Sequence, residues 1–157
     1  MIPNTLKDVI QVINNWPPQQ WYVSLKYAHG GNIDAIKYQN ILRMSDSRRH
    51  STGKGISLPY ILTRSDQLRA LYSASPGGDT HTDIGRMTIQ SHVTMEITVE
   101  QRRDPSDQKF YIEFFKDGIS LGRMLNENPT TYEKVYVIVG NASGDNNVVS
   151  NIKFGEL

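Results

Sequence analysis

The chain has 157 residues, of which 38% are hydrophobic and 21% are charged. This length suits one soluble domain whose core buries roughly two thirds of the unfolded surface. Its 17 Lys and Arg residues nearly balance 16 Asp and Glu residues, for a net charge of +1, so the composition gives no indication of a basic surface that would attract nucleic acids. Cysteine is absent, which excludes disulfides, thiolate metal sites and a thiol nucleophile. We expect one domain over residues 1–157 and no nucleic-acid partner.

The first patterned segment is "TLKDVIQVINN" at residues 5–15. Leu6, Val9 and Ile13 recur at helical spacing, and Thr5 with Asp8 forms a helix-capping pattern. The same stretch is rich in β-branched residues, which favour a strand. A short helix and an edge strand both stay open for it, and we favour the strand. The N-terminus lacks the pattern of a signal peptide, and no apolar run is long enough to cross a membrane, so we expect no membrane insertion.

Further along the chain, apolar and polar residues alternate with a period of two. In "HVTMEITVEQ", Val93, Met95, Ile97 and Val99 share one face, and Thr and Glu residues take the other. "WYVSLKY" and "KVYVIVG" repeat this pattern, which places Trp21 in the core. Similar runs occur at residues 37–44, 56–63, 67–74, 110–115 and 148–154, with turn-forming segments between them. Many short strands at this spacing predict an all-β antiparallel β-sandwich or barrel with little helix.

One short stretch, "GISLG", matches the G-x-S-x-G signature of serine hydrolases at Ser120. A nucleophilic serine of that class stands between a strand and a helix. Here a strand over 110–115 precedes the turn "KDG", so Ser120 falls on the returning strand of a hairpin. We expect no catalytic role for Ser120.

Four strand patterns together resemble the C-terminal half of concanavalin A-like and laminin G-like jelly rolls: "HVTMEITVEQ", "KFYIEFFKDGISLGRML", "YEKVYVIVGN" and "VVSNIKFGEL". "QWYVSLKY" and "NILRMSD" fit earlier strands of the same plan, so the resemblance covers the chain from about Trp21 to Leu157. It implies a lectin-like jelly roll that binds a glycan or protein ligand, without catalysis, through its loops or one sheet face. It also implies an extracellular or cell-surface domain excised from a longer chain, with the cytoplasm as the alternative. Asn141 begins a glycosylation sequon, which would matter only in that exported setting.

Some members of that superfamily are glycoside hydrolases with carboxylates in an E-x-D-x-E pattern on one strand. "EITVE" matches this spacing at Glu96 and Glu100 but has Thr98 at the central position. Glu96 and Glu100 would lie ~13 Å apart on a regular strand, whereas retaining hydrolases hold their carboxyl groups ~5 Å apart. We therefore prefer the non-catalytic function, with a glycoside hydrolase as the alternative. An oligomerising or viral attachment domain is the second alternative.

The loops supply the candidate ligand-binding residues. Polar side chains and glycines gather in "HGGN", "SPGGDTHTD" and "NASGDNN", and the candidates are His29, Asn32, Asp79, His81, Asp83, Asn141, Asp145 and Asn146. No pair of histidines has the spacing of a zinc site. The resemblance implies calcium as the one metal to consider, at Asp79, Asp83 and Asp145, although Asp and Asn are also ordinary turn residues. We favour turns, and we expect no other cofactor.

Overall fold

The computed structural model describes residues 8–29, 40–47, 54–61, 64–74, 81–139 and 147–157. These residues form strands and turns, and they include no helix that could cross a membrane. The strands in chain order are β1 (Asp8–Trp16), β2 (Trp21–His29), β3 (Asn40–Ser45), β4 (Gly55–Ile61), β5 (Arg64–Ser73), β6 (His81–Thr88), β7 (Met95–Arg103), β8 (Phe110–Lys116), β9 (Ile119–Asn126), β10 (Tyr132–Val139) and β11 (Asn147–Glu156).

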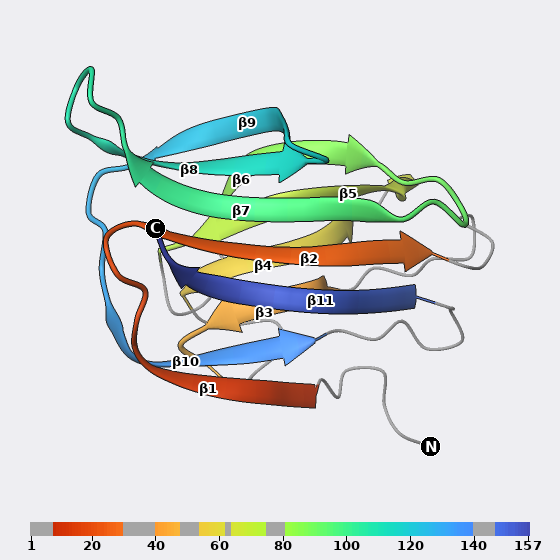
Figure 1. The fold of residues 1–157 in the computed structure, drawn as a ribbon, viewed down its shortest axis with the longest axis horizontal. Coiled ribbons are helices and arrows are strands. Elements are labelled where there is room, and N and C mark those ends of the chain that lie inside the picture. Colours follow the sequence, from red (N-terminus) through yellow and green to blue (C-terminus); the bar gives the residue numbers. More distant parts are fainter. Residues whose placement is uncertain (1–7, 30–39, 48–53, 62–63, 75–80, 140–146) are drawn as a thin grey trace.

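The strands form two sheets that pack face to face (Figure 1). The larger sheet has six strands in the order β1-β10-β3-β4-β5-β6, and the smaller has five in the order β11-β2-β7-β8-β9. Neighbouring strands are antiparallel throughout both sheets. The all-β antiparallel sandwich that the alternation predicts is therefore confirmed.

The core lies between the sheets, and the alternation of the sequence determines which side chains enter it. On β2, Trp21, Val23, Leu25 and Tyr27 are buried, whereas the residues between them are partly or fully exposed. β7 and β10 follow the same alternation. Burial of one large apolar side chain contributes about 1.5–3 kcal/mol. A slip of one residue would turn a whole apolar set toward solvent, so the inward side chains also fix the register.

The N-terminal segment is a strand, as we favoured. Residues 8–16 pair with β10 at the edge of the six-stranded sheet, while residues 5–7 lie outside the described part of the chain. Ile13 and Trp16 pack against the core from this strand. The apolar spacing that resembled a helix therefore serves an edge strand, and tertiary packing decides between the two.

The hairpin prediction for Ser120 is also confirmed. β8 and β9 pair directly, with a turn at Asp117 and Gly118, whose φ angles are 50° and 81°. Ser120 is exposed on β9. It follows a turn and not the strand-to-helix junction that a nucleophilic serine of the G-x-S-x-G class requires.

Two parts of the strand prediction were wrong. β7 begins at Met95 and not at Val93, whose side chain is 42% exposed. The chain turns just before the strand, at His92, which has a φ of 64°. In addition, His81 and Asp83, expected in a loop, lie on β6 and pair with β5. The backbone hydrogen bonds of this pairing outweigh the turn preference of "HTD".

The outer edges of the two sheets, β6 and β9, come close together on one side of the sandwich. A Cβ atom on Gly122 of β9 would overlap the carbonyl oxygen of Ile84 on β6, and one on Gly85 would lie 2.8 Å from the carbonyl oxygen of Leu121. Glycine is therefore required at Gly122, where the φ of 156° also disfavours a side chain. This close approach positions β6 against β9 beside the cleft described below.

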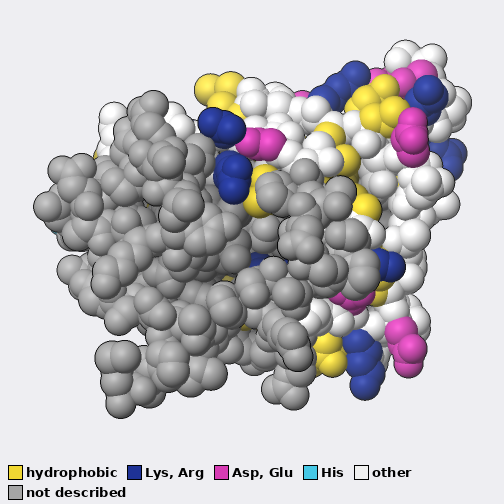
Figure 2. All heavy atoms as spheres, turned by 180° about the vertical axis from the view of Figure 1, so that it is seen from behind, with side chains coloured by type: hydrophobic (Ala, Val, Ile, Leu, Met, Phe, Trp, Pro, Cys, Tyr) yellow, Lys and Arg dark blue, Asp and Glu magenta, His cyan; other side chains and the backbone are white. Residues whose placement is uncertain are grey.

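Charges of both signs share the described surface. Figure 2 shows the molecule from behind, so the end on the left in Figure 1 lies on the right, and there basic and acidic side chains are intermingled. This mixture agrees with the net charge of +1.

Candidate binding cleft

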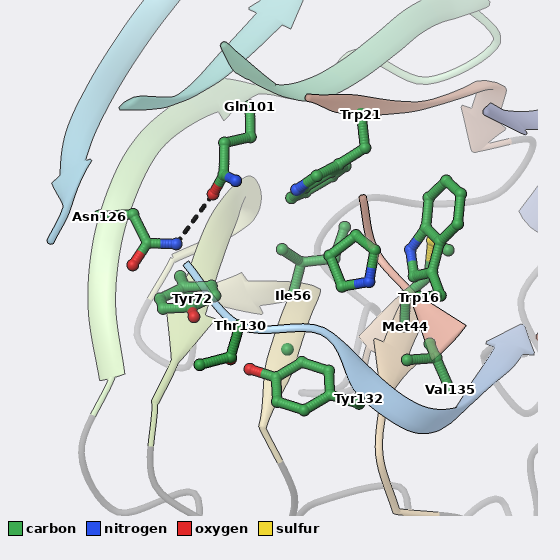
Figure 3. A pocket seen from close by; sticks show the side chains of 12 residues that line it. Trp16, Trp21, Met44, Ile56, Tyr72, Gln101, Asn126, Thr130, Tyr132 and Val135 are labelled. Atoms are coloured by element: carbon green, nitrogen blue, oxygen red, sulfur yellow. Dashed lines mark hydrogen bonds between the residues drawn. The ribbon is translucent and has the colours of Figure 1, made fainter. Parts of the chain in front are cut away.

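A cavity opens between the two sheets at the end of the sandwich where β2, β4 and β10 begin (Figure 3). We call it the inner chamber, and its volume is about 30 Å³. Both sheets contribute to its wall, which consists of Trp16, Pro17, Trp21, Met44, Gly55, Ile56, Tyr72, Gln101, Asn126, Thr130, Tyr132 and Val135. Most of these residues are apolar or aromatic, and the polar groups come from a few positions.

The chamber forms at the end of the core. Here the inward-facing side chains at the strand ends have no further inward-facing residues next to them to fill the space between the sheets. Trp21 is the first residue of β2, and Tyr72 is the second-last residue of β5. Trp16 ends β1, and its ring meets the ring of Phe154 edge-on, with centroids 5.7 Å apart and an interplanar angle of 73°. Thr131 donates a hydrogen bond of 2.7 Å to the carbonyl oxygen of Pro17. This bond ties the connection between β9 and β10 to the segment that follows β1.

A buried polar bridge holds the wall on the side of the five-stranded sheet. Gln101 is 2% exposed, and its Nε2 donates to the carbonyl oxygen of Gln19 over 2.8 Å. Its Oε1 accepts from Nδ2 of Asn126, also over 2.8 Å. The carboxamide oxygen of Asn126 points away from Gln101 (Figure 3). Because buried polar groups need partners, this chain of amides fixes the orientation of Asn126 at the cavity.

Trp21 presents an unusual donor in the chamber wall. Its side chain is 4% exposed, yet its indole N–H has no hydrogen-bond acceptor among the residues that the structure describes. Figure 3 shows the indole nitrogen at the end of the ring that lies toward Gln101 and Asn126, two other residues of the chamber wall. A buried donor without an acceptor costs about 1–3 kcal/mol. An acceptor from solvent or from a ligand in the chamber would remove that cost.

The chamber continues into a wider opening, which we call the mouth. Tyr72, Asn126, Thr130 and Tyr132 border both spaces. The mouth has a volume of about 540 Å³, and its remaining wall residues are Lys54, Ala74, Thr82, Met124, Leu125, Glu127 and Asn128. A volume of this size falls within the roughly 300–1,000 Å³ of small-molecule sites. The inner chamber and the mouth together form the end cleft.

Two tyrosines stand where the chamber meets the mouth. Burial raises the pKa of the Tyr132 phenol well above its usual value, and a hydrogen bond with Tyr72 acts in the same direction. Tyr132 therefore stays protonated at neutral pH and can both donate and accept a hydrogen bond. Together with Asn126, these phenols offer neutral hydrogen-bonding groups beside aromatic faces.

The structure describes few of the residues predicted from the loops. His29 is fully buried at the end of β2. Asp83 is exposed on β6, and its carboxylate accepts a hydrogen bond of 3.1 Å from Arg86. His81 begins β6, but its side chain is not among those described. Asn32, Asp79, Asn141, Asp145 and Asn146 lie outside the described residues, so their role in binding stays a prediction.

The strands that flank these loops end at opposite ends of the sandwich. His29 pairs with Asn147 at the end far from the cleft, eight residues along β2 from Trp21, which corresponds to ~26 Å. Ala74 and Thr82, by contrast, border the mouth. The described residues include no group of three or more His, Asp and Glu side chains that could hold a metal. Because Asp79 and Asp145 are not among them, the calcium site stays a prediction.

Glu96 and Glu100 lie on the outer face of β7, opposite the buried Met95, Ile97 and Val99. Oε1 of Glu100 accepts a hydrogen bond of 2.8 Å from Nε of Arg102. Glu96 is exposed, four residues away on the same face of a regular strand. The two carboxylates therefore do not converge, which agrees with a solvated polar face.

Next to this face, the connection between β7 and β8 is held by a network of charged side chains. The Arg123 guanidinium lies 3.9 Å from the centroid of the Tyr111 ring and donates to Asp104 over 3.1 Å. The Tyr111 hydroxyl donates to Asp107 over 2.6 Å. Hydrogen bonds from Ser106 hold the pKa of Asp104 below its usual value, and that from Tyr111 does the same for the pKa of Asp107. These groups pair with one another, so we interpret the network as structural.

Sequence reasoning missed most of the end cleft. Trp21 was predicted to be buried, which is confirmed, but its position beside a cavity was not foreseen. The signal that could have indicated the site is Gln101, which follows Met95, Ile97 and Val99 at the next inward position of the alternation. A polar residue on a buried face is more informative than an exposed apolar one.

No family model matches the chain, and no curated protein matches its sequence. Solved structures match its fold. The binding domain of botulinum neurotoxin serotype D has a TM-score of 0.65 and 9% identity, over 93% of this chain and 37% of its own. Sheep galectin-11, solved with glycerol, has a TM-score of 0.54 and 9% identity, over 99% of this chain and 100% of its own. The carbohydrate recognition domain of Emp47p has a TM-score of 0.57 and 10% identity, over 91% and 75%.

The chain has the concanavalin A-like jelly-roll fold. It spans about a third of the neurotoxin binding domains, 34% for serotype C1 and 37% for serotype D. Enzymes also match this fold. An alginate lyase from Pseudomonas aeruginosa and a sialidase from Trypanosoma rangeli match the chain with TM-scores of 0.55 and 0.54, each at 14% identity. At such identities the jelly roll is shared, but the function depends on the site.

Proposed function

We propose that this protein is a non-catalytic recognition domain that binds a glycan in the end cleft. The observation that carries the proposal is the composition of the cleft. Aromatic rings of Tyr72 and Tyr132 stand beside the neutral amide of Asn126 and the hydroxyl of Thr130. Sugars present apolar ring faces and many hydroxyl groups, so they match a surface that combines aromatic area with polar tips.

The solved structures with the same fold support this class of ligand. One match is named as a carbohydrate recognition domain, and another as a carbohydrate binding module. A third is botulinum neurotoxin type C, whose cell entry depends on interaction with two ganglioside molecules. The end cleft adds what the fold alone lacks, namely a concave site with convergent polar groups.

Among the described residues, the cleft offers no pair of carboxylates for hydrolysing a glycosidic bond. Of those that line its wall, Glu127 is the only carboxylate, whereas glycoside hydrolysis commonly needs two flanking carboxyl groups. Glu96 and Glu100 lie on the outer face of β7, away from it. Binding without bond cleavage is therefore the function that this site supports best.

The test begins with a glycan array and continues with calorimetry on the glycans that bind. Asn128→Ala removes an exposed polar side chain of the mouth, and Lys26→Ala serves as a control on the outer face of β2. We expect Asn128→Ala to weaken binding about threefold to tenfold, the equivalent of one net hydrogen bond, and Lys26→Ala to leave it unchanged. Equal effects of the two variants, or release of reducing sugar from a bound polysaccharide, would contradict the proposal.

A further inference from the structure

The inner chamber is shaped for one small group with a particular chemistry. Its volume of about 30 Å³ exceeds the roughly 10–15 Å³ needed for one water, so it accepts a group of two or three heavy atoms and not a sugar ring. A sugar in the mouth would therefore reach the chamber only with a substituent. Tyr72, Asn126, Thr130 and Tyr132 line the passage between the two spaces.

The walls select the substituent. Met44, Ile56 and Val135 are each at most 5% exposed and offer only apolar atoms. A carboxylate would lose its hydration there without a cation to replace it, which is strongly unfavourable. A hydroxyl group gains little over the water that it displaces. A methyl group, by contrast, gains from burial against these side chains.

The unpaired N–H of Trp21 sets the second requirement: the substituent must provide a hydrogen-bond acceptor. The Trp21 side chain is 96% buried, since it is 4% exposed, and its N–H has no acceptor in the described part of the chain. A substituent that fills the chamber must therefore carry both an apolar end and a hydrogen-bond acceptor that is not also a donor. An acetyl group has these features, because its carbonyl oxygen accepts and its methyl group is apolar.

We propose that the inner chamber takes the acetyl group of an acetamido sugar, whose carbonyl oxygen accepts the Trp21 N–H and whose methyl group packs among Met44, Ile56 and Val135. The sugar ring then occupies the mouth. This inference rests on the proposed function and narrows its ligand class to N-acetylated glycans.

Two measurements test the chamber directly. In the first, calorimetry compares chitotriose with cellotriose, which is also uncharged and carries a hydroxyl group in place of each acetamido group. We expect chitotriose to bind at least tenfold more tightly, as the combined loss of one hydrogen bond and one buried methyl group predicts. In the second, N-methylacetamide is titrated into ¹⁵N-labelled protein while the indole N–H signals are followed. The Trp21 signal should shift, with the signal of Trp16 assigned through Trp16→Phe.

Two variants change the chamber in different ways. Trp21→Phe keeps an aromatic ring but removes the donor, and Val135→Ile adds a methylene group to the wall. We expect both variants to reduce the ratio of the two trisaccharide affinities toward one. Because Trp21→Phe alters the core, its thermal unfolding is compared with that of the wild type. If Trp21→Phe does not fold, the affinity ratio of Val135→Ile tests the chamber instead.

The outcomes separate this inference from the function on which it rests. If chitotriose and cellotriose, or another pair of glycans with and without acetamido groups, bind equally at the mouth, the acetyl site is refuted while glycan binding stands. If no glycan binds and N-methylacetamide shifts nothing, both are refuted. If an acetyl-lysine peptide binds and shifts the Trp21 signal but no glycan does, the chamber is an acetyl site and the glycan assignment is refuted.

Discussion

Replacing Gln101 by Leu should destabilise the protein by about 2–3 kcal/mol. The change removes two hydrogen bonds, one to the carbonyl oxygen of Gln19 and one from Asn126, and each contributes about 1 kcal/mol net. It also leaves the buried Asn126 amide, 7% exposed, without its acceptor, which costs more than the bond itself. The greater hydrophobicity of Leu offsets part of this loss, so we place the total below the sum.

Urea unfolding, followed by tryptophan fluorescence and circular dichroism, measures the effect. Thermal unfolding gives a second measurement: for a domain of this length, 1 kcal/mol corresponds to roughly 2–4 °C in Tm, so we expect Tm to fall by about 4–12 °C. Gln11→Leu provides a matched control on β1, where the side chain is exposed, and it should stay within about 0.5 kcal/mol of the wild type.

A double-mutant cycle with Asn126→Leu separates the amide bridge from general packing. If the bridge acts as described, the double variant is more stable than the sum of the single changes predicts, because no partner is left stranded. Strictly additive effects, or a Gln101→Leu variant as stable as Gln11→Leu, would refute this account of the chamber wall.

Three further predictions follow from single positions. Gly122→Ala should lower the free energy of unfolding in urea by more than about 2 kcal/mol, because its Cβ atom would overlap the carbonyl oxygen of Ile84. The control Gly118→Ala meets no atom within 4 Å and should cost only the ~1–2 kcal/mol of a left-handed φ. Equal losses in the two variants would contradict the close approach of β6 and β9. Because burial raises the pKa of Tyr132, the folded protein keeps the phenol proton at a pH where the unfolded chain loses it. The free energy of unfolding should therefore fall as the pH rises above about 10, and it should fall less steeply in Tyr132→Phe. Parallel curves of stability against pH for the two proteins would count against a buried phenol. Ser120→Ala should keep the free energy of unfolding within about 0.5 kcal/mol of the wild type, since the side chain is exposed on a hairpin strand. An ester-hydrolase activity that disappears in this variant would contradict the prediction.

Under the proposed function, the end cleft recognises its ligand mainly through neutral groups. Its central groups are neutral: the phenols of Tyr72 and Tyr132, the amide of Asn126 and the indole of Trp21. Neutral hydrogen bonds and aromatic contacts depend weakly on ionic strength, whereas exposed charge pairs are screened by salt. Ligand binding in this cleft should therefore persist at high salt.

Much of the fold follows from the sequence, because side chains on a strand alternate between two faces and only one face enters the core. The alternations at Trp21–Tyr27 and Met95–Val99 predict buried positions that the structure confirms. The same logic missed β6, whose "HTDIGRMT" contains turn-forming residues and a glycine. Its strand depends on pairing with β5 and on the approach of β9, and neither is visible in a local pattern.

The sequence by itself determined the strand class of this protein, the hairpin that disqualifies Ser120 as a nucleophile, and the burial of Trp21. Only the tertiary structure decided that Trp21, Gln101 and Tyr132 meet at one cavity, since they belong to β2, β7 and β10. Burial follows from local periodicity, but a cavity depends on where the ends of distant strands come together. That arrangement is set by pairing and packing over the whole chain, so no short segment contains it.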